Sequence, residues 1–138
     1  EGFAKRLNAL TLGQRKQLSR DRKRKNIELL VFDSSAMVVR ELLNNPWVTE
    51  RDVVRLASRH GAPAEVLDEL CRSDRWLTHY NVRKALIFNP RTPIPFALGL
   101  LPHLREKDLQ FMVSGGGLRK ELIDTARERL RKSKRRVL

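Results

Sequence analysis

Apolar residues recur along the chain at spacings of three and four, the pattern of helices that bury one face. Val38 and Leu42 follow a polar stretch, and Val53 and Leu56 follow Thr49 in the same way. The longest series consists of apolar residues four apart near the C-terminus: Leu118, Leu122, Ala126 and Leu130. No stretch alternates apolar and polar residues as a half-buried strand would. The pattern therefore predicts an all-helical chain.

Capping residues and prolines mark where these helices begin and end. Thr11 and Gln14 have the spacing of a capping box, in which each side chain bonds to a free backbone N–H of the first turn. Thr49 is a second N-cap, and Asn45-Pro46 ends the preceding helix because proline disfavours helical backbone in the residue before it. Two further starts carry a proline suited to the first turn, at Pro63 and at Thr92-Pro93. These signals predict about seven helices of about ten residues each.

A shift of the sequence by 44 residues aligns two of the predicted helices. Two apolar helices could align by chance through their apolar residues alone, but here the Asn-Pro pairs that end them also align. The shift pairs Val38 with Val82, Arg40 with Lys84, Leu42 with Leu86, Leu43 with Ile87, Asn45 with Asn89, and Pro46 with Pro90. We therefore expect an internal repeat.

The stretch VRKALIFNPRTP at 82–93, followed by FALGLL at 96–101, resembles the bacterial leucine-rich-repeat-variant and HEAT-like helical repeats. The resemblance covers about residues 33–104 and implies a short right-handed α-solenoid whose concave face binds proteins or nucleic acids. We accordingly expect three parts within one compact domain: a basic N-terminal helical segment at 1–32, HEAT-like repeats at 33–117, and a C-terminal helix with a basic tail at 118–138.

Charge is concentrated at the two ends of the chain. The 29 Lys and Arg against 16 Asp and Glu give +13, of which 1–25 carry +7, 26–118 carry zero and 119–138 carry +6. Basic runs of this density suit phosphate groups, because each neutralised phosphate releases a counterion. We therefore predict a nucleic-acid partner, with DNA favoured, contacted by Arg20, Arg22, Lys23, Arg24, Lys25, Arg131, Lys132, Lys134, Arg135 and Arg136.

A second set of candidates lies in the charge-balanced middle of the chain. Arg75 beside Trp76 suits a platform on which a base stacks, although a large aromatic between helices equally suits the packed interior. Arg40 and Lys84 are equivalent in the shift, so we expect them on one face. The groove or stacking candidates are Arg40, Arg55, Arg59, Arg75, Trp76, Arg83 and Lys84. They support an alternative function, a protein-interaction scaffold whose concave face holds a partner while the basic ends contact an acidic protein.

Other classes of function lack support in the sequence. The longest uncharged run, 92–104, has 13 residues, fewer than the ~18 of a membrane span. The histidines are widely spaced and no nucleophile, phosphate-loop or metalloprotease motif is present, so we expect no catalytic residue, metal or cofactor. The lone Cys71 suits a reducing cytoplasm. The chain begins at Glu1 rather than Met, which suits a fragment or a processed product.

Overall fold

The computed structural model describes residues 2–115 and 117–137, and within them the chain is helical throughout, with no strand. This confirms the all-helical prediction. The helices are α1 (Gly2–Asn8), α2 (Leu12–Leu18), α3 (Arg24–Leu30), α4 (Ala36–Leu43), α5 (Glu50–Ala57), α6 (Ala64–Cys71), α7 (Asp74–Leu77), α8 (Tyr80–Phe88), α9 (Ile94–Leu100), the 3₁₀ helix η1 (Leu101–His103), α10 (Glu106–Ser114) and α11 (Lys120–Val137).

The predicted number of about seven helices is too low for the described residues. The stretch before residue 32 folds into three short helices, α1 to α3, and α7 is a single turn between α6 and α8. Such short helices bury too few apolar residues to show a clear periodicity in the sequence. The sequence pattern predicts about seven helices of about ten residues each, whereas the described residues form eleven α-helices, most of which are shorter than ten residues.

The predicted helix boundaries are confirmed where a capping box or an Asn-Pro pair determines them. Thr11 Oγ1 accepts a hydrogen bond from the Gln14 N–H at 3.1 Å, and Gln14 Oε1 accepts one from the Thr11 N–H at 2.8 Å, which completes the expected capping box. Thr49 caps α5 in the same way, with Asp52 as its partner. α4 and α8 each end just before an Asn-Pro pair. The two expected proline starts are displaced by one residue, because Pro63 and Pro93 are N-caps.

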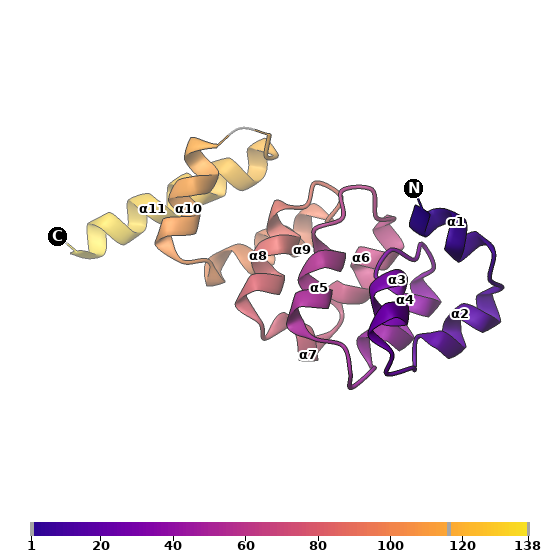
Figure 1. Cartoon of the computed structure of the whole chain (residues 1–138). Coiled ribbons are helices and arrows are strands. Elements are labelled where there is room, and N and C mark those ends of the chain that lie inside the picture. The colour runs from indigo at the N-terminus through magenta and orange to yellow at the C-terminus, as the bar shows by residue number, and fades with distance from the viewer. Residues whose placement is uncertain (1, 116, 138) are drawn as a thin grey trace.

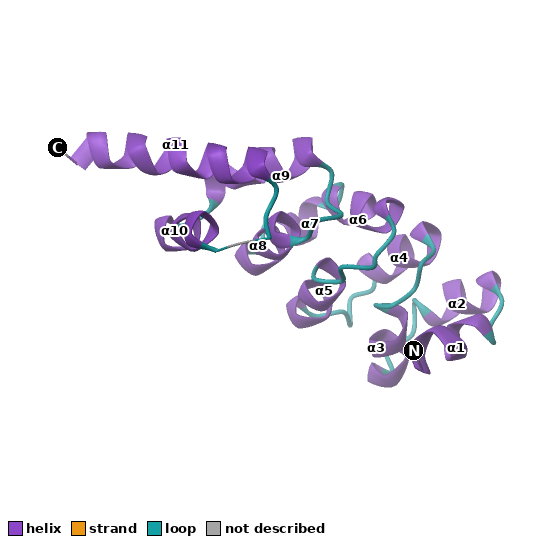
Figure 2. Ribbon diagram, turned by 90° about the horizontal axis from the view of Figure 1, so that it is seen from above, coloured by secondary structure: helices purple, strands orange, loops and turns teal. Residues whose placement is uncertain are grey.

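The helices form two rows that are seen edge-on in Figure 2. The upper row in that view contains α2, α4, α6, α9 and α11, and the lower row contains α3, α5, α8 and α10. Helices of the lower row begin at residues 24, 50, 80 and 106. The 44-residue shift is longer than any of these intervals, and it pairs α4 of the upper row with α8 of the lower row. The array is elongated, with the two termini at opposite ends (Figure 1).

Two buried asparagines hold equivalent turns in place. Asn45 Nδ2 donates to the carbonyls of Ser19 and Asp21 at 2.9 and 2.7 Å, and its Oδ1 accepts from the Trp47 N–H at 2.8 Å. Asn89 Nδ2 donates in the same way to the carbonyls that close α5, and its Oδ1 accepts from the N–H two residues later. Each side chain satisfies carbonyls at the end of a neighbouring helix, which would otherwise lack partners. The Asn-Pro pair is therefore a helix stop and a link between helices.

The core consists of two apolar clusters. The first extends from Leu7 to Leu86, and it crosses residue 32, the expected limit of the N-terminal segment. The second extends from Ile87 to Ala126. Leu118, Leu122, Ala126 and Leu130 all pack in this second cluster, but α11 begins only at Lys120, so Leu118 precedes the helix and the other three form its apolar stripe. None of the described helices is both long and apolar enough to cross a bilayer.

Candidate nucleic-acid interface

The C-terminal basic segment is the end of α11, which projects beyond the rest of the molecule (Figures 1 and 2). The apolar stripe stops at Leu130, and no described side chain beyond it belongs to the core. Lys132, Lys134 and Arg135 are exposed and form no ion pair with any described residue, whereas Arg131 pairs with a glutamate of its own helix at 3.2 Å. The side chain of Arg136 lies outside the described residues. This end of α11 therefore presents a concentrated positive charge to solvent.

The N-terminal basic segment is partly neutralised within the fold. The Arg20 guanidinium pairs with Glu41 at 3.3 Å, and this hydrogen bond holds the pKa of the Glu41 carboxyl below its ordinary value. Arg24 Nη2 and Nη1 donate to the two oxygens of Asp52 at 2.5 and 3.0 Å. Burial alone would raise the pKa of Asp52, but the bonds from Arg24 and Thr49 outweigh it and lower that pKa. The predicted phosphate contacts Arg20 and Arg24 thus already have carboxylate partners.

The three other cations of this segment, Arg22, Lys23 and Lys25, are exposed and form no ion pair with the described residues. They lie at the α3 end of the molecule, whereas the end of α11 lies at the opposite one (Figure 1). The two basic segments therefore do not merge into one patch. Screening at physiological ionic strength acts over about 8 Å, so the electrostatic fields of the two segments do not reinforce each other.

The expectation that Arg40 and Lys84 share a face is wrong. Arg40 lies on α4 in the upper row and pairs with Glu69 of α6 at 2.6 Å, while Lys84 lies on α8 in the lower row and pairs with Asp108 of α10 at 3.2 Å. The reason is the length of the shift, which carries a residue from one row to the other. Arg55, on α5, is exposed and has no ion-pair partner among the described residues.

Two further arginines of the middle set bond to backbone carbonyls inside the fold. Arg59 Nη1 donates to the carbonyls of Val31 and Asp33, each at 2.9 Å, so this guanidinium closes the end of α3. Its burial lowers the pKa of Arg59 below the ordinary value. Arg83 Nη1 donates to the Leu77 carbonyl at 2.8 Å. Both side chains hold helix ends through Nη1, and the Nε of Arg83 is buried without a hydrogen-bond partner among the described residues.

The predicted stacking platform at Arg75 and Trp76 is corrected by the burial of the ring. Trp76 is 3% exposed, and its indole N–H donates to the Leu43 carbonyl at 2.8 Å. The Arg75 guanidinium lies 4.5 Å from the ring centroid. No ring face remains open for a base, and the other interpretation of this tryptophan, packing between helices, fits its surroundings.

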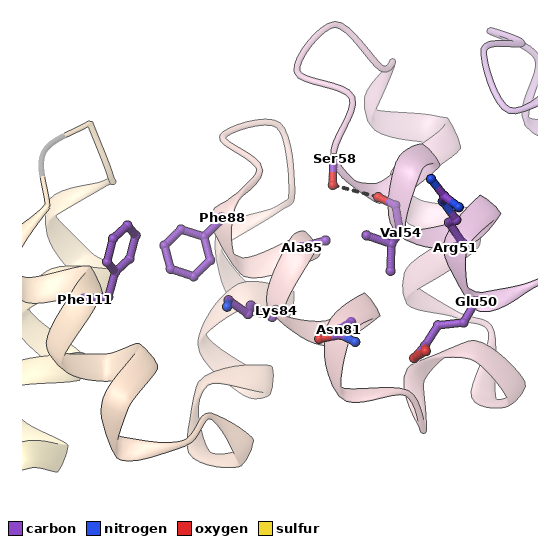
Figure 3. A pocket seen from close by; sticks show the side chains of 9 residues that line it. All are labelled: Glu50, Arg51, Val54, Ser58, Asn81, Lys84, Ala85, Phe88 and Phe111. Atoms are coloured by element: carbon purple, nitrogen blue, oxygen red, sulfur yellow. Dashed lines mark hydrogen bonds between the residues drawn. The ribbon is translucent and has the colours of Figure 1, made fainter.

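A groove between α5, α8 and α10 was not anticipated from the sequence. It has a volume of about 550 Å³ and an apolar lining to which Val54, Ala85, Phe88 and Phe111 contribute. The rings of Phe88 and Phe111 lie side by side with centroids 5.9 Å apart, as Figure 3 shows, and Phe111 is 63% exposed. The charged residues that line the groove are of both signs: Glu50, Arg51 and Lys84. No local signal predicts this groove, because its residues come from three helices.

Asp108, beside this groove, gathers several hydrogen bonds. It accepts one from the Tyr80 hydroxyl and pairs with Lys84, and the Tyr80 oxygen in turn accepts from the Arg105 N–H at 3.0 Å. The bond from Tyr80 is the largest of the influences that hold the pKa of Asp108 below its ordinary value. The cluster joins α8 to α10, which is a structural role.

The described residues contain no group of three or more His, Cys, Asp or Glu side chains placed as metal ligands would be. Their exposed features include unpaired cations, an apolar groove and aromatic rings. In comparisons with known proteins, no protein-family model, no curated protein and no solved structure matches the chain.

Proposed function

We propose that the protein is a non-enzymatic helical-repeat module that binds nucleic acid, with DNA favoured, through its two basic segments. The observation that carries the proposal is the end of α11, where residues 129–136 include six cations and no acid. One or two cations suffice to complement a helix dipole, so six exceed any need of the helix itself. A projecting helix with this charge suits a phosphate backbone, because little protein surrounds it to obstruct a duplex.

The proposed architecture is a short right-handed α-solenoid of HEAT-like repeats. Its support is the alternation of the chain between two rows, in which the lower helices begin at residues 24, 50, 80 and 106. An array of this kind holds its ends apart, and α11 alone is about 27 Å long. The two basic segments lie at opposite ends, so only a long anionic partner can contact both of them. A small anion would contact one, and we therefore favour the long partner.

The proposal is tested by measuring the affinity for a fluorescein-labelled DNA duplex as a function of salt. If ~6 to 10 phosphates are contacted, the affinity falls by ~10³ to 10⁵ between about 50 and 200 mM salt. The triple variant Lys132→Gln, Lys134→Gln, Arg135→Gln should bind more weakly and with a shallower salt dependence. A duplex of RNA in a parallel titration shows whether DNA is preferred.

The control variant removes the same charge from exposed cations outside the two segments: Arg55→Gln, Arg91→Gln, Lys107→Gln. It should retain most of the affinity. Absence of duplex binding at low salt, or an equal loss in both triple variants, contradicts the proposal.

A second candidate function is a protein-interaction scaffold that uses the groove between α5, α8 and α10. It is favoured by the exposed ring of Phe111 next to Phe88, since large exposed aromatics commonly mark contact sites. The positive charge of Arg51 suits an acidic partner. Under this function, Phe111→Ser combined with Arg51→Gln abolishes partner binding, and the triple variant of α11 has the smaller effect. The location of the damaging substitutions distinguishes the two functions.

A further inference from the structure

The two tryptophans of the chain have opposite environments. Trp76 is buried, whereas Trp47 is 55% exposed in the turn between α4 and α5. A half-exposed indole leaves a large apolar surface in water, and in folded proteins such a surface is often part of a contact site. Trp47 is therefore the tryptophan that is free to stack on a ligand.

The turn that carries Trp47 is fixed to the N-terminal basic segment itself. Asn45 bonds to the carbonyls of Ser19 and Asp21, which flank Arg20, and it also accepts the Trp47 N–H. From the other side, Arg24 Nη1 donates to the Trp47 carbonyl at 3.3 Å. The stretch from 19 to 24 thus bonds to both sides of the turn, so the backbone of Trp47 is held beside this basic segment. These bonds also hold the turn in one conformation before any ligand arrives.

The fold of the turn does not require an aromatic residue at this position. In the equivalent turn Asn89 makes the same three hydrogen bonds, and the residue that corresponds to Trp47 is Arg91. Arg91 is exposed, and its backbone N–H donates to Asn89. Its side chain makes no hydrogen bond to the described residues. Packing of the turn therefore does not explain the indole, which points to a ligand.

The free charges of the segment that is bonded to this turn match a phosphate backbone. Arg20 and Arg24 are paired with carboxylates, which leaves Arg22, Lys23 and Lys25 exposed. The nearest acid in the run, Asp21, accepts hydrogen bonds from Asn26 and from the Arg22 N–H. An aromatic face beside free cations is the combination that binds single-stranded nucleic acid, where each base offers a face for stacking. A duplex keeps its base faces covered.

We propose that Trp47 and the segment 20–25 form a binding site for unpaired nucleotides, in which a base stacks on the indole and Arg22, Lys23 and Lys25 contact the adjoining phosphates. This inference rests on the proposed function and refines it. The N-terminal end of the array selects single strands, whereas the end of α11 attracts any nucleic acid through charge alone.

The experiment titrates oligo(dT) and a DNA duplex of equal length into the protein at low salt, with tryptophan emission and anisotropy as readouts. Stacking on Trp47 quenches the emission of the exposed indole, while the emission of buried Trp76 stays constant. Trp47→Ala should lower the affinity for oligo(dT) by about 5- to 150-fold, the usual effect of one lost stacking partner. Its duplex affinity should stay unchanged, and Trp47→Phe should retain part of the oligo(dT) affinity because a ring remains.

Phe111→Ala is the matched control, since it removes the other strongly exposed aromatic, and it should leave oligo(dT) binding unchanged. Circular dichroism of Trp47→Ala checks that the helices persist. If wild-type protein binds the duplex but Trp47→Ala binds oligo(dT) as tightly as wild type, the inference is overturned and the proposed function stands. If neither nucleic acid binds at low salt, both fail. Equal quenching by polyglutamate also overturns the inference, because it shows a surface for acidic polypeptides.

Discussion

Asn89 allows the sharpest test of the fold, because it is buried and all its polar atoms have partners. The side chain is 1% exposed. Its Nδ2 donates to the carbonyls of Ala57 and Arg59 at 2.7 and 2.8 Å, and its Oδ1 accepts from the Arg91 N–H at 2.9 Å. Asn89→Ala removes all three hydrogen bonds at once. It leaves two carbonyl oxygens at the end of α5 and one N–H of the turn without these partners.

The expected loss follows from the burial of those groups. A hydrogen bond contributes about 0.5 to 1.5 kcal/mol net, and an unsatisfied buried group costs about 1 to 3 kcal/mol. The Ala57 carbonyl is fully buried, while the residues that carry the other two groups are partly or fully exposed, so water satisfies part of what is lost. The free energy of unfolding should therefore fall by about 2 to 4 kcal/mol. Asn45→Ala should have an effect of the same size.

The assay is urea denaturation followed by far-UV circular dichroism. With a slope of about 2 kcal/mol per molar urea, the middle of the usual range, the midpoint should move down by roughly 1 to 2 M. Asn81→Ala is the control, because Asn81 is exposed and its side chain has no hydrogen bond in the described part of the chain. Asn89→Asp keeps nearly the original shape, but it places a carboxylate oxygen next to two carbonyl oxygens, which repel it. It should therefore destabilise the fold at least as much as Asn89→Ala. A midpoint for Asn89→Ala that equals that of Asn81→Ala would refute the reasoning.

Three further predictions concern the core and its titratable groups. Trp76→Phe removes the N–H that bonds to the Leu43 carbonyl at 2.8 Å, and urea denaturation should show a loss of about 1 to 3 kcal/mol, with no change contradicting this role. The pKa of Asp108 is held below 3.8, chiefly by the Tyr80 hydroxyl, so its contribution to stability is complete above about pH 5 and is lost as the pH falls below 3.8. When the free energy of unfolding is measured as a function of pH, Asp108→Asn should show a smaller loss of stability below pH 3.8 than the wild type. An equal loss in both proteins would exclude Asp108 as its source. Burial raises the pKa of Cys71 to about 11, so a thiol reagent at neutral pH should react far more slowly with native than with urea-unfolded protein, and equal rates would show an accessible thiol.

Helix ends proved predictable wherever the controlling chemistry is local. The box at Thr11 and the stops before Pro46 and Pro90 depend on residues within four positions of each other, and the sequence displays them directly. The short N-terminal helices and the extra turn α7 have no comparable signal. Their form depends on packing against α4 and α8, which a single stretch of sequence does not specify.

The candidate site was less predictable, because its residues acquire their roles from distant partners. Arg24 and Arg40 have the sequence context of free cations, but their carboxylate partners lie 28 and 29 residues away. Trp47 and Trp76 each stand in a polar, turn-like stretch, so nothing local separates the exposed indole from the buried one. The concentration of cations at the end of α11 was predictable because it depends on composition alone: no acid occurs after Glu128.

The division of the core falls inside a single helix. Leu86 and Ile87 are consecutive in α8, yet they belong to different clusters, and Leu100 packs against both. The second cluster is much the smaller, so we expect the part of the chain from α9 to α11 to open at a lower free energy than the first cluster. It can open while the first cluster, and with it the turn of Trp47, stays folded. Warming would then release the C-terminal cations as a disordered polycation while the indole remains in its fixed position.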